Sequence, residues 1–403
     1  MSRPGQPERS ATYAEVFAVA EFRWSWLALV GSVIGDQLAR VALAILVFDR
    51  TGSAGLSALT YALTMLPDVV SGPLLGGLAD RFPRRRIMVA CDAARAGLVA
   101  LMAIPDTPLW VLCVLLVAVQ LLAAPFQSAR TAFLATLMTG DTYRAAVGLS
   151  TVTVQAAQLA GFVAGGTIVA LLGSSQALAL NALSFAVSAV LLRFGIQERP
   201  VPLDPAARPS WWGSLVAGAR LVWHNRRLRY LLALICVPGF YITVEGLATP
   251  YAASIGGGAI AAGILFAANP AGQVVGILLA SRIAPARRMA MMGPLAIGTC
   301  AVLIGCVFQP GLWVTVALWT ASGLCASFMP LAQATFVQAI PDAQRGQVIG
   351  LARTALVVAQ GMGILVAGAA ADHGKPAMVV AVAGVLGVLY AAGAARGYRR
   401  AGV

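Results

Sequence analysis

Long apolar runs separated by short polar segments make up most of the chain. A helix needs about 20 mostly apolar residues to cross a bilayer. Twelve runs meet this length, near residues 24–48, 56–79, 87–104, 109–131, 145–172, 176–194, 229–251, 257–281, 290–308, 312–334, 347–371 and 376–395. Short connections with Gly, Pro, Asp or Ser separate them. The pattern predicts an all-α membrane protein with twelve transmembrane helices.

The two halves of this pattern resemble each other. A shift by half the chain length superposes Gly148 on Gly350 and Gly161 on Gly363. Parallel six-helix repeats are one known transporter architecture, in which the substrate site lies between the repeats. We therefore expect two pseudo-symmetric six-helix bundles. The predicted parts are a cytoplasmic N-terminal tail, a first bundle, a cytoplasmic linker with an amphipathic segment, a second bundle and a cytoplasmic tail, at 1–22, 23–195, 196–228, 229–396 and 397–403.

The composition excludes a soluble domain. Hydrophobic residues make up 59% of the 403 residues and only 11% are charged, whereas a soluble domain carries about 25% charged residues. The six cysteines lie inside apolar runs without metal or disulfide spacing. We expect no metal and no cofactor, a lipid bilayer as the surroundings, and a monomer.

The basic residues indicate an orientation. With the N-terminus placed in the cytoplasm, Arg50 and Lys375 are the basic residues in loops on the opposite side. The basic segments on the cytoplasmic side are those before residue 24 and at 81–86, 130–144, 193–229, 282–288, 345 and 396–400. By the positive-inside rule, both termini face the cytoplasm of a bacterial inner (plasma) membrane. The net charge of +13 is thus interpreted as a topology signal and not as a nucleic-acid site.

The linker contains a segment with mixed aromatic, aliphatic and basic residues, at 211–229. This mixture is typical of an amphipathic helix at the membrane surface. A helical lead-in to the seventh span is an equally good interpretation, and the two are compatible.

A motif between the second and third spans suggests a family. The chain reads Gly76-Gly77-Leu78-Ala79-Asp80-Arg81-Phe82-Pro83-Arg84-Arg85-Arg86. This resembles the loop signature of the major facilitator superfamily, with Pro83 where the family usually has Gly. The resemblance implies a gating loop whose Asp holds the outward-facing state against the eleventh helix. Its residues here are Gly76, Asp80, Arg81, Arg84 and Arg85. Alternatively, the arginines serve only the orientation.

A second, weaker resemblance covers nearly the whole chain. Its pieces are Gly35-Asp36, Thr51-Gly52-Ser53-Ala54, Asp92, Arg95, and the segment from Pro341-Asp342 to Arg345-Gly346. They are similar to the siderophore and macrolide exporters of bacteria. In one respect the chain departs from drug–proton antiporters, because Phe162 stands where their fifth-span signature has Pro.

Ionisable residues inside the spans are candidates for function, since each costs about 2.5–3.5 kcal/mol or more at the bilayer centre. The candidates for proton coupling or substrate binding are Asp36, Arg40, Asp68 and Glu245. Asp36 and Arg40 lie one turn apart, so a permanent ion pair is the alternative to a proton site. Glu245 has no basic residue near it in the sequence, and a carboxylate near the outer mouth is its alternative.

A further set of charges is interpreted as a structural cluster towards the cytoplasmic side. Its members are Asp92, Arg95, Arg130 and Arg353. Arg353 is also a candidate gate partner or anion contact, because it enters the eleventh span two turns from its cytoplasmic end.

The leading hypothesis is a secondary active transporter that exports a small amphipathic organic compound, such as a drug, antibiotic or siderophore-like metabolite, in exchange for protons. No nucleotide-binding loop is present, which excludes direct drive by ATP. Proton-coupled uptake of a small metabolite is the alternative. A membrane enzyme or a receptor is more distant, because the sequence offers no nucleophile with a nearby base. Substrate and protons are the expected partners.

Overall fold

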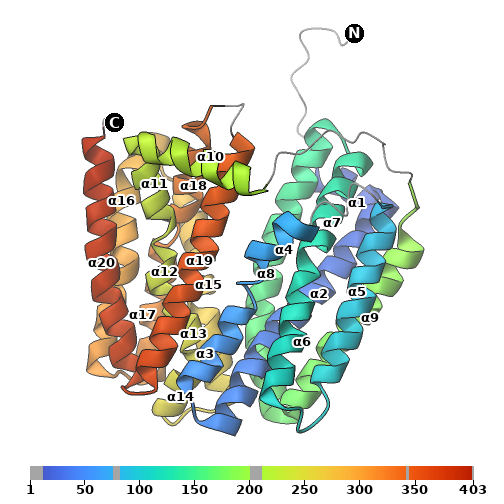
Figure 1. Cartoon of the computed structure of the whole chain (residues 1–403), viewed down its shortest axis with the longest axis horizontal. Helices are drawn as coiled ribbons and strands as arrows, with labels where there is room; N and C mark the ends of the chain where they lie inside the picture. Colours follow the sequence, from blue (N-terminus) through green and yellow to red (C-terminus); the bar gives the residue numbers. More distant parts are fainter. Residues whose placement is uncertain (1–11, 76–81, 200–210, 342–344, 402–403) are drawn as a thin grey trace.

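The computed structural model describes residues 12–75, 82–199, 211–341 and 345–401, and their regular structure is helical throughout. Figure 1 shows two bundles side by side, one from each half of the chain. The first holds α1 (Tyr13–Ala18), α2 (Ala20–Thr51), α3 (Ala54–Leu63), α4 (Asp68–Leu75), α5 (Arg84–Met102), α6 (Leu109–Leu121), α7 (Ala123–Leu137), α8 (Gly140–Leu172) and α9 (Ser174–Gly195).

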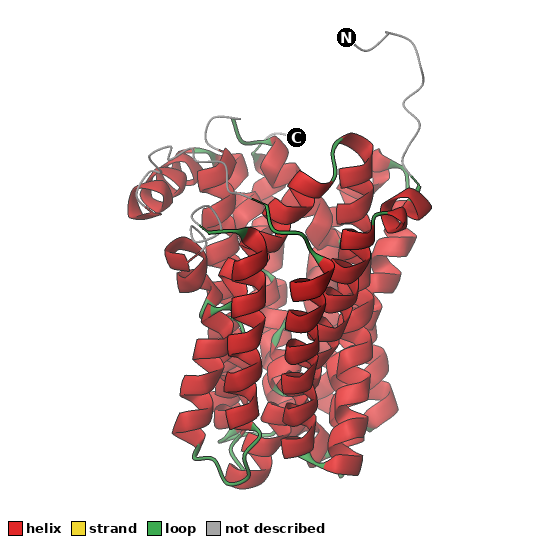
Figure 2. Cartoon of the chain, turned by 90° about the vertical axis from the view of Figure 1, so that its right-hand side faces the viewer, coloured by secondary structure: helices red, strands yellow, loops and turns green. Residues whose placement is uncertain are grey.

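The second half holds more and shorter helices, because several of its spans are broken. They are α10 (Trp211–His224), α11 (Arg226–Ile235), α12 (Pro238–Tyr241), α13 (Thr243–Gly246), α14 (Ala248–Ser254), α15 (Ala259–Ser281), α16 (Pro285–Ala301), the 3-10 helix η2 (Val302–Phe308), α17 (Leu312–Cys325), α18 (Phe328–Gln338), α19 (Arg345–Ala371) and α20 (Pro376–Arg400). Figure 2 shows the long helices nearly parallel, with the loops gathered at the two ends of the molecule.

Ten helical stretches of the described residues are long and apolar enough to cross a membrane. The two predicted spans that do not qualify are the second and the third. The second is divided by a turn at 64–67 into α3 and α4. The third, α5, carries Asp92 and Arg95 in addition to the arginines of its first turn. The expectation of two bundles of membrane helices is confirmed, while the count of twelve depends on these two segments.

Prolines lie at or next to several of the breaks. Proline lacks the N–H that a helix needs and clashes with the preceding turn. Pro67 ends the turn between α3 and α4, Pro125 lies just after the junction of α6 and α7, and Pro238 begins α12. The seventh span consists of four short helices, α11 to α14. This break places Glu245 on a helix of only four residues.

The two ends of the molecule differ. The first helix, α1, the C-terminal end of α20, and α10 lie at one end, called the termini end here, and α14 lies at the opposite end, called the far end (Figure 1). The predicted amphipathic segment forms α10 and the start of α11, with Asn225 between them. Asn225 caps α11 by accepting hydrogen bonds from the N–H groups of Arg227 and Leu228, at 3.0 and 3.2 Å. On α10, Val222 is buried while the Trp223 side chain is 72% exposed, so α10 has two contrasting faces.

Glycines let helix backbones approach closely where helices cross. Small residues have this role in membrane proteins, where lipid is as apolar as the helices themselves. A Cβ atom added at Gly166 of α8 would lie 2.7 Å from the Cα atom of Gly263 in α15. This crossing joins the two halves. In the second half, a Cβ atom at Gly363 of α19 would overlap the carbonyl oxygen of Gly239.

We predict that Gly363→Leu destabilises the protein while Gly350→Leu does not. The first substitution forces α19 away from α12, and overpacking of this kind costs about 1–3 kcal/mol. Gly350 lies on the same helix with nothing within 4 Å of an added Cβ atom. Thermal unfolding in detergent, followed by intrinsic fluorescence, should show a Tm several degrees lower for the first variant only. Equal losses in both variants would refute the assigned crossing.

Candidate functional site

The predicted gating loop is only partly described. Gly76, Asp80 and Arg81 lie outside the described residues, as does Asp342 before α19. Arg84 donates to the carbonyl oxygen of Ala132 at 3.1 Å and to Thr136 at 2.9 Å, both on α7. Arg85 donates to the carbonyl oxygen of Arg193 on α9. These two arginines thus brace α5 against its neighbours within the first half, and their part in a gate stays a prediction.

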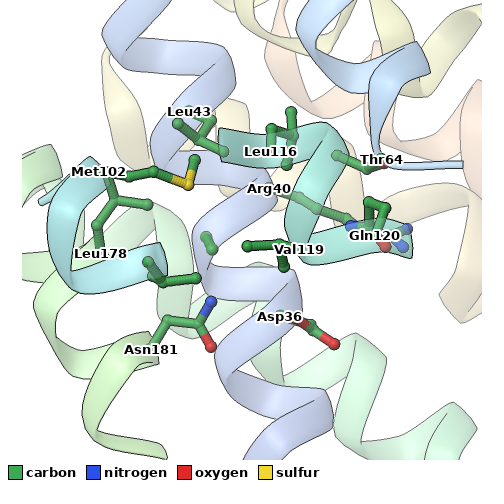
Figure 3. A pocket seen from close by; sticks show the side chains of 12 residues that line it. Asp36, Arg40, Leu43, Thr64, Met102, Leu116, Val119, Gln120, Leu178 and Asn181 are labelled. Carbon is green, nitrogen blue, oxygen red and sulfur yellow. The ribbon is translucent and has the colours of Figure 1, made fainter. Parts of the chain in front are cut away.

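Asp36 pairs with a residue that the sequence did not indicate. Its Oδ2 atom lies 3.7 Å from Nη2 of Arg95 on α5, whereas no ion pair joins it to Arg40, although both residues are described. The alternative of a permanent Asp36–Arg40 ion pair is therefore not what the structure shows, and a proton site at Asp36 stays a prediction. Figure 3 shows the reason: the Arg40 side chain runs towards Gln120, and the Asp36 carboxylate points away from it. Neighbours from other helices decided the partner, and spacing along one helix did not.

Arg95 is shared between two carboxylates. Its Nη1 atom lies 3.7 Å from Oδ1 of Asp92, and its guanidinium lies 4.4 Å above the centre of the Phe185 ring. Asp92 is fully buried, and the Ser188 hydroxyl donates to its Oδ2 atom at 2.5 Å. Asp36, with 27% of its side chain exposed, is the more open of the two carboxylates. This set of Asp36, Arg95 and Asp92 is called the Arg95 triad here, and it carries one net negative charge when both carboxylates are ionised.

The other two members of the predicted cluster lie elsewhere. Arg130 is buried on α7 and donates to the Ser150 hydroxyl at 3.2 Å, and no described carboxylate pairs with it. Arg353 forms an ion pair with Asp68 at 3.4 Å, which joins α19 to α4 across the two halves. Arg130 and Arg353 thus contact partners outside the pair of Asp92 and Arg95, and a structural role shared by all four charges stays a prediction.

Glu245 is buried between the two halves and not exposed near a mouth. Only 8% of the residue is exposed, and the Tyr61 hydroxyl of α3 donates a hydrogen bond to its Oε2 atom. The Tyr61 ring stacks on Phe266 of α15, which in turn stacks on Phe162 of α8, both at 5.6 Å between ring centres. Arg40 is the charged neighbour of both Glu245 and Tyr61. Phe162, the residue that replaces the signature proline, therefore packs against the other half.

Sequence reasoning missed Tyr61, although one signal was present. Tyr61 lies seven residues after Ala54, so the two positions share one side of α3. A tyrosine inside an apolar run gives no sign of a polar contact by itself. Only the folded structure, in which α13 lies beside α3, shows that the Tyr61 hydroxyl contacts the carboxylate of Glu245.

A small cavity of about 20 Å³ lies beside Asp36 and Arg40, which is room for a single water molecule. Its polar lining also includes Thr64, Gln120 and Asn181 (Figure 3). Because the cavity touches both Asp36 and Arg40, it provides a place where a proton or a water could reach them. Within the described residues, no group of His, Cys, Asp or Glu could hold a metal ion.

We predict that Arg95→Ala lowers stability far more than Arg144→Ala. Removing one partner of a buried ion pair costs about 3–5 kcal/mol, because the other charge stays buried. Arg144 pairs with Asp141 at 2.9 Å on the surface, where such pairs contribute about 0–1 kcal/mol. Denaturant unfolding in detergent measures the difference. Asp92→Asn added to Arg95→Ala should recover part of the loss, and no recovery would contradict the pairing.

Comparison with known proteins places the chain in a family. The model of the Major Facilitator Superfamily matches residues 25–303 and 246–401. The chain is 27% identical over 359 residues to the multidrug efflux pump Tap of Mycobacterium tuberculosis, covering 84% of each protein. It is 29% identical over 100 residues to macrolide efflux protein A of Streptococcus pyogenes, covering 24% of this chain and 25% of the relative.

Solved structures share the fold at low identity. The POT family transporter PepTSo superposes with a TM-score of 0.74 at 11% identity, covering 95% of this chain and 98% of that one. The nucleoside transporter NupG superposes with a TM-score of 0.69 at 15% identity, covering 95% and 100%. The family match, the two bundles of membrane helices and the loop motif agree, and the chain belongs to the Major Facilitator Superfamily.

Proposed function

We propose that the chain exports small amphipathic organic compounds across the bacterial inner membrane in exchange for protons. The observation that carries this proposal is the charge balance of the ionisable groups around Asp36 and Glu245. Three carboxylates, on Asp36, Asp92 and Glu245, face two arginines, Arg40 and Arg95. The set thus has one negative charge in excess, and net charge inside a bilayer is costly.

One proton would cancel this excess charge, and so would one cationic group of a substrate. The proton and the cationic group do not both bind tightly at the same time, because binding of the second would give the set a net positive charge. Competition of this kind is the thermodynamic basis of exchange between two ligands. Asp36 is the better placed carboxylate for it, since it is part exposed and borders the water-sized cavity, while Asp92 is fully buried.

Protonation of Asp36 leaves a stable arrangement behind. Arg95 keeps its ion pair with Asp92 when Asp36 is neutral, so no buried charge is left without a partner. The reverse assignment is less favourable. Neutral Asp92 would lose the advantage of the charged hydrogen bond from Ser188, since hydrogen bonds to an ionised acceptor are about twice as strong as neutral ones.

Glu245 couples the charge set to the interface between the halves. Its hydrogen bond from Tyr61 joins α13 to α3. The charge on Glu245 therefore affects the strength of the contact between the two halves at α3 and α13. We assign Asp36 to proton exchange and Glu245 to binding of a cationic group or a second proton. The names of the relatives, a multidrug efflux pump and a macrolide efflux protein, support export of organic compounds. We also propose that a single chain carries out transport, as a monomer.

Everted membrane vesicles test this proposal directly. With an imposed gradient, acid inside, vesicles with the wild-type protein should take up more of the basic compounds in a panel of macrolides and lipophilic amines than vesicles without the protein, where weak bases accumulate only by protonation inside. Asp36→Asn should abolish this gradient-driven uptake, because the variant cannot release a proton, while exchange of labelled for unlabelled substrate continues. Asp106→Asn, an exposed carboxylate in a loop, is the matched control and should transport normally.

The alternatives give different results in the same assay. A proton-coupled uptake symporter would accumulate substrate in right-side-out vesicles and empty the everted ones. A receptor would show no flux, and Asp36→Asn would leave its response unchanged. An enzyme would alter the labelled compound, which chromatography of the vesicle contents detects.

We further propose that the termini end faces the cytoplasm, because the arginine-rich segments 84–86 and 226–229, together with α10, lie at that end. Protease-cleavable tags placed at both termini should be cut in everted vesicles and protected in intact spheroplasts. Cleavage in spheroplasts would reverse the orientation and with it the direction of transport.

A further inference from the structure

Polar contacts between the two halves are few, and on the first half they all involve the same short stretch of chain. Within the described ranges, the hydrogen bonds and ion pairs that cross between the halves join Asp372 to Ser53 and Gly55, Glu245 to Tyr61, and Arg353 to Asp68. On the first half, all of them come from α3, α4 and the cap of α3. On the second half, two of the three come from α19 or the residue after it. The contact nearest the far end, made by Asp372, belongs to no predicted site.

Asp372 completes the N-terminal cap of a helix from the other half. Its Oδ1 atom accepts the N–H of Gly55 at 3.0 Å, and the Ser53 hydroxyl lies 3.1 Å from both carboxylate oxygens. The same Ser53 oxygen accepts the N–H of Leu56 at 3.0 Å. The first N–H groups of a helix have no partner within the helix, and its dipole favours an anion there. The carboxylate therefore satisfies α3 only while the halves are in contact.

The backbones below this cap are in close contact, which makes the contact sensitive to separation. A Cβ atom at Gly368 of α19 would overlap the methyl group of Ala58 and lie 3.2 Å from the Cα atom of Gly55. Ala58 is fully buried. Because these backbones are so close, a small movement of α19 away from α3 breaks the packing at Gly368 and the cap together.

The loops of the far end are otherwise tied within their own half. Arg50 donates to the carbonyl oxygen of Thr107 at 2.7 Å in the first half. Lys375 donates to Gln309 at 2.9 Å in the second half. Each half is braced at this end, and of the polar contacts between the halves the one of Asp372 with Ser53 and Gly55 lies here.

We propose that Asp372, Ser53 and Gly55 form a latch that holds the far end closed and opens when the halves rock apart. The inference rests on the proposed transport function only in requiring that the two ends open in turn. A carboxylate is suited to this task because it binds strongly to a helix N-terminus and is readily hydrated once released. Loss of one charged hydrogen-bond partner should shift the closed-to-open equilibrium about tenfold.

Hydrogen–deuterium exchange of the full-length protein in nanodiscs tests the latch without labels. In Asp372→Ala, amides at the start of α3 and the end of α19 should exchange about tenfold faster than in wild type. At the same time, amides at the starts of α5 and α19, at the termini end, should exchange more slowly, because opening one end closes the other. Ser53→Ala should change both ends in the same directions by a smaller factor.

The reciprocal change separates a latch from a merely structural contact. If Asp372→Ala speeds exchange at both ends, or at neither, the latch is wrong. Asp372→Asn should shift less than the alanine variant, since its amide oxygen still accepts from Gly55. Asp49→Ala is the matched control, because Asp49 is an exposed carboxylate at the same end with no hydrogen bond or ion pair to any described residue. Exchange is measured without substrate or gradient, so a failure of proton coupling leaves this result standing.

Discussion

A charged side chain buried inside a membrane protein needs a partner of opposite charge or a hydrogen-bond donor. In the first bundle, the packing of several helices depends on meeting this need for Asp92. Asp92 is fully buried on α5, and it is balanced by Arg95 on the same helix and by the hydroxyl of Ser188 on α9. The Phe185 ring of α9 lies against the guanidinium of Arg95. These contacts hold α5 to α9 and present Arg95 to Asp36 on α2. The third span can carry charge because this pairing and the hydrogen bond from Ser188 offset part of the cost of burying Asp92.

The interface between the halves follows a different rule. Close approach of backbones at Gly166 and Gly263, and stacking of Phe162, Phe266 and Tyr61, supply packing without strong directional bonds. Polar contacts occur at a few separate places along α3 and α4. An interface with this composition has no large group of buried polar bonds to break. Separation of the halves is then a matter of a few contacts, which suits a protein that must alternate between two arrangements.

Several features followed from the sequence for clear physical reasons. Lipid requires long apolar helices, so hydropathy predicted the membrane spans and the twofold plan. The loop motif near Arg84 indicated the family by its spacing of Gly, Asp and Arg residues alone. The importance of Asp36 and Glu245 was predicted because a carboxylate inside a membrane is expensive. Their partners were not predictable, since Arg95 and Tyr61 reach them from helices distant in the chain.

What the sequence determined by itself was the class of molecule. The length and spacing of the apolar runs show that the chain forms membrane helices, and the cost of charge in lipid marks candidate residues for function. What only the tertiary structure decided was which charge meets which. Arg40 turned towards Gln120, Arg353 reached Asp68, and Asp372 capped a helix of the other half. The physical reason is range. The hydrophobicity of a residue is a property of that residue alone and can be taken from the sequence. An ion pair or a helix cap instead requires two groups within about 4 Å of each other, and only the folded chain brings such groups together.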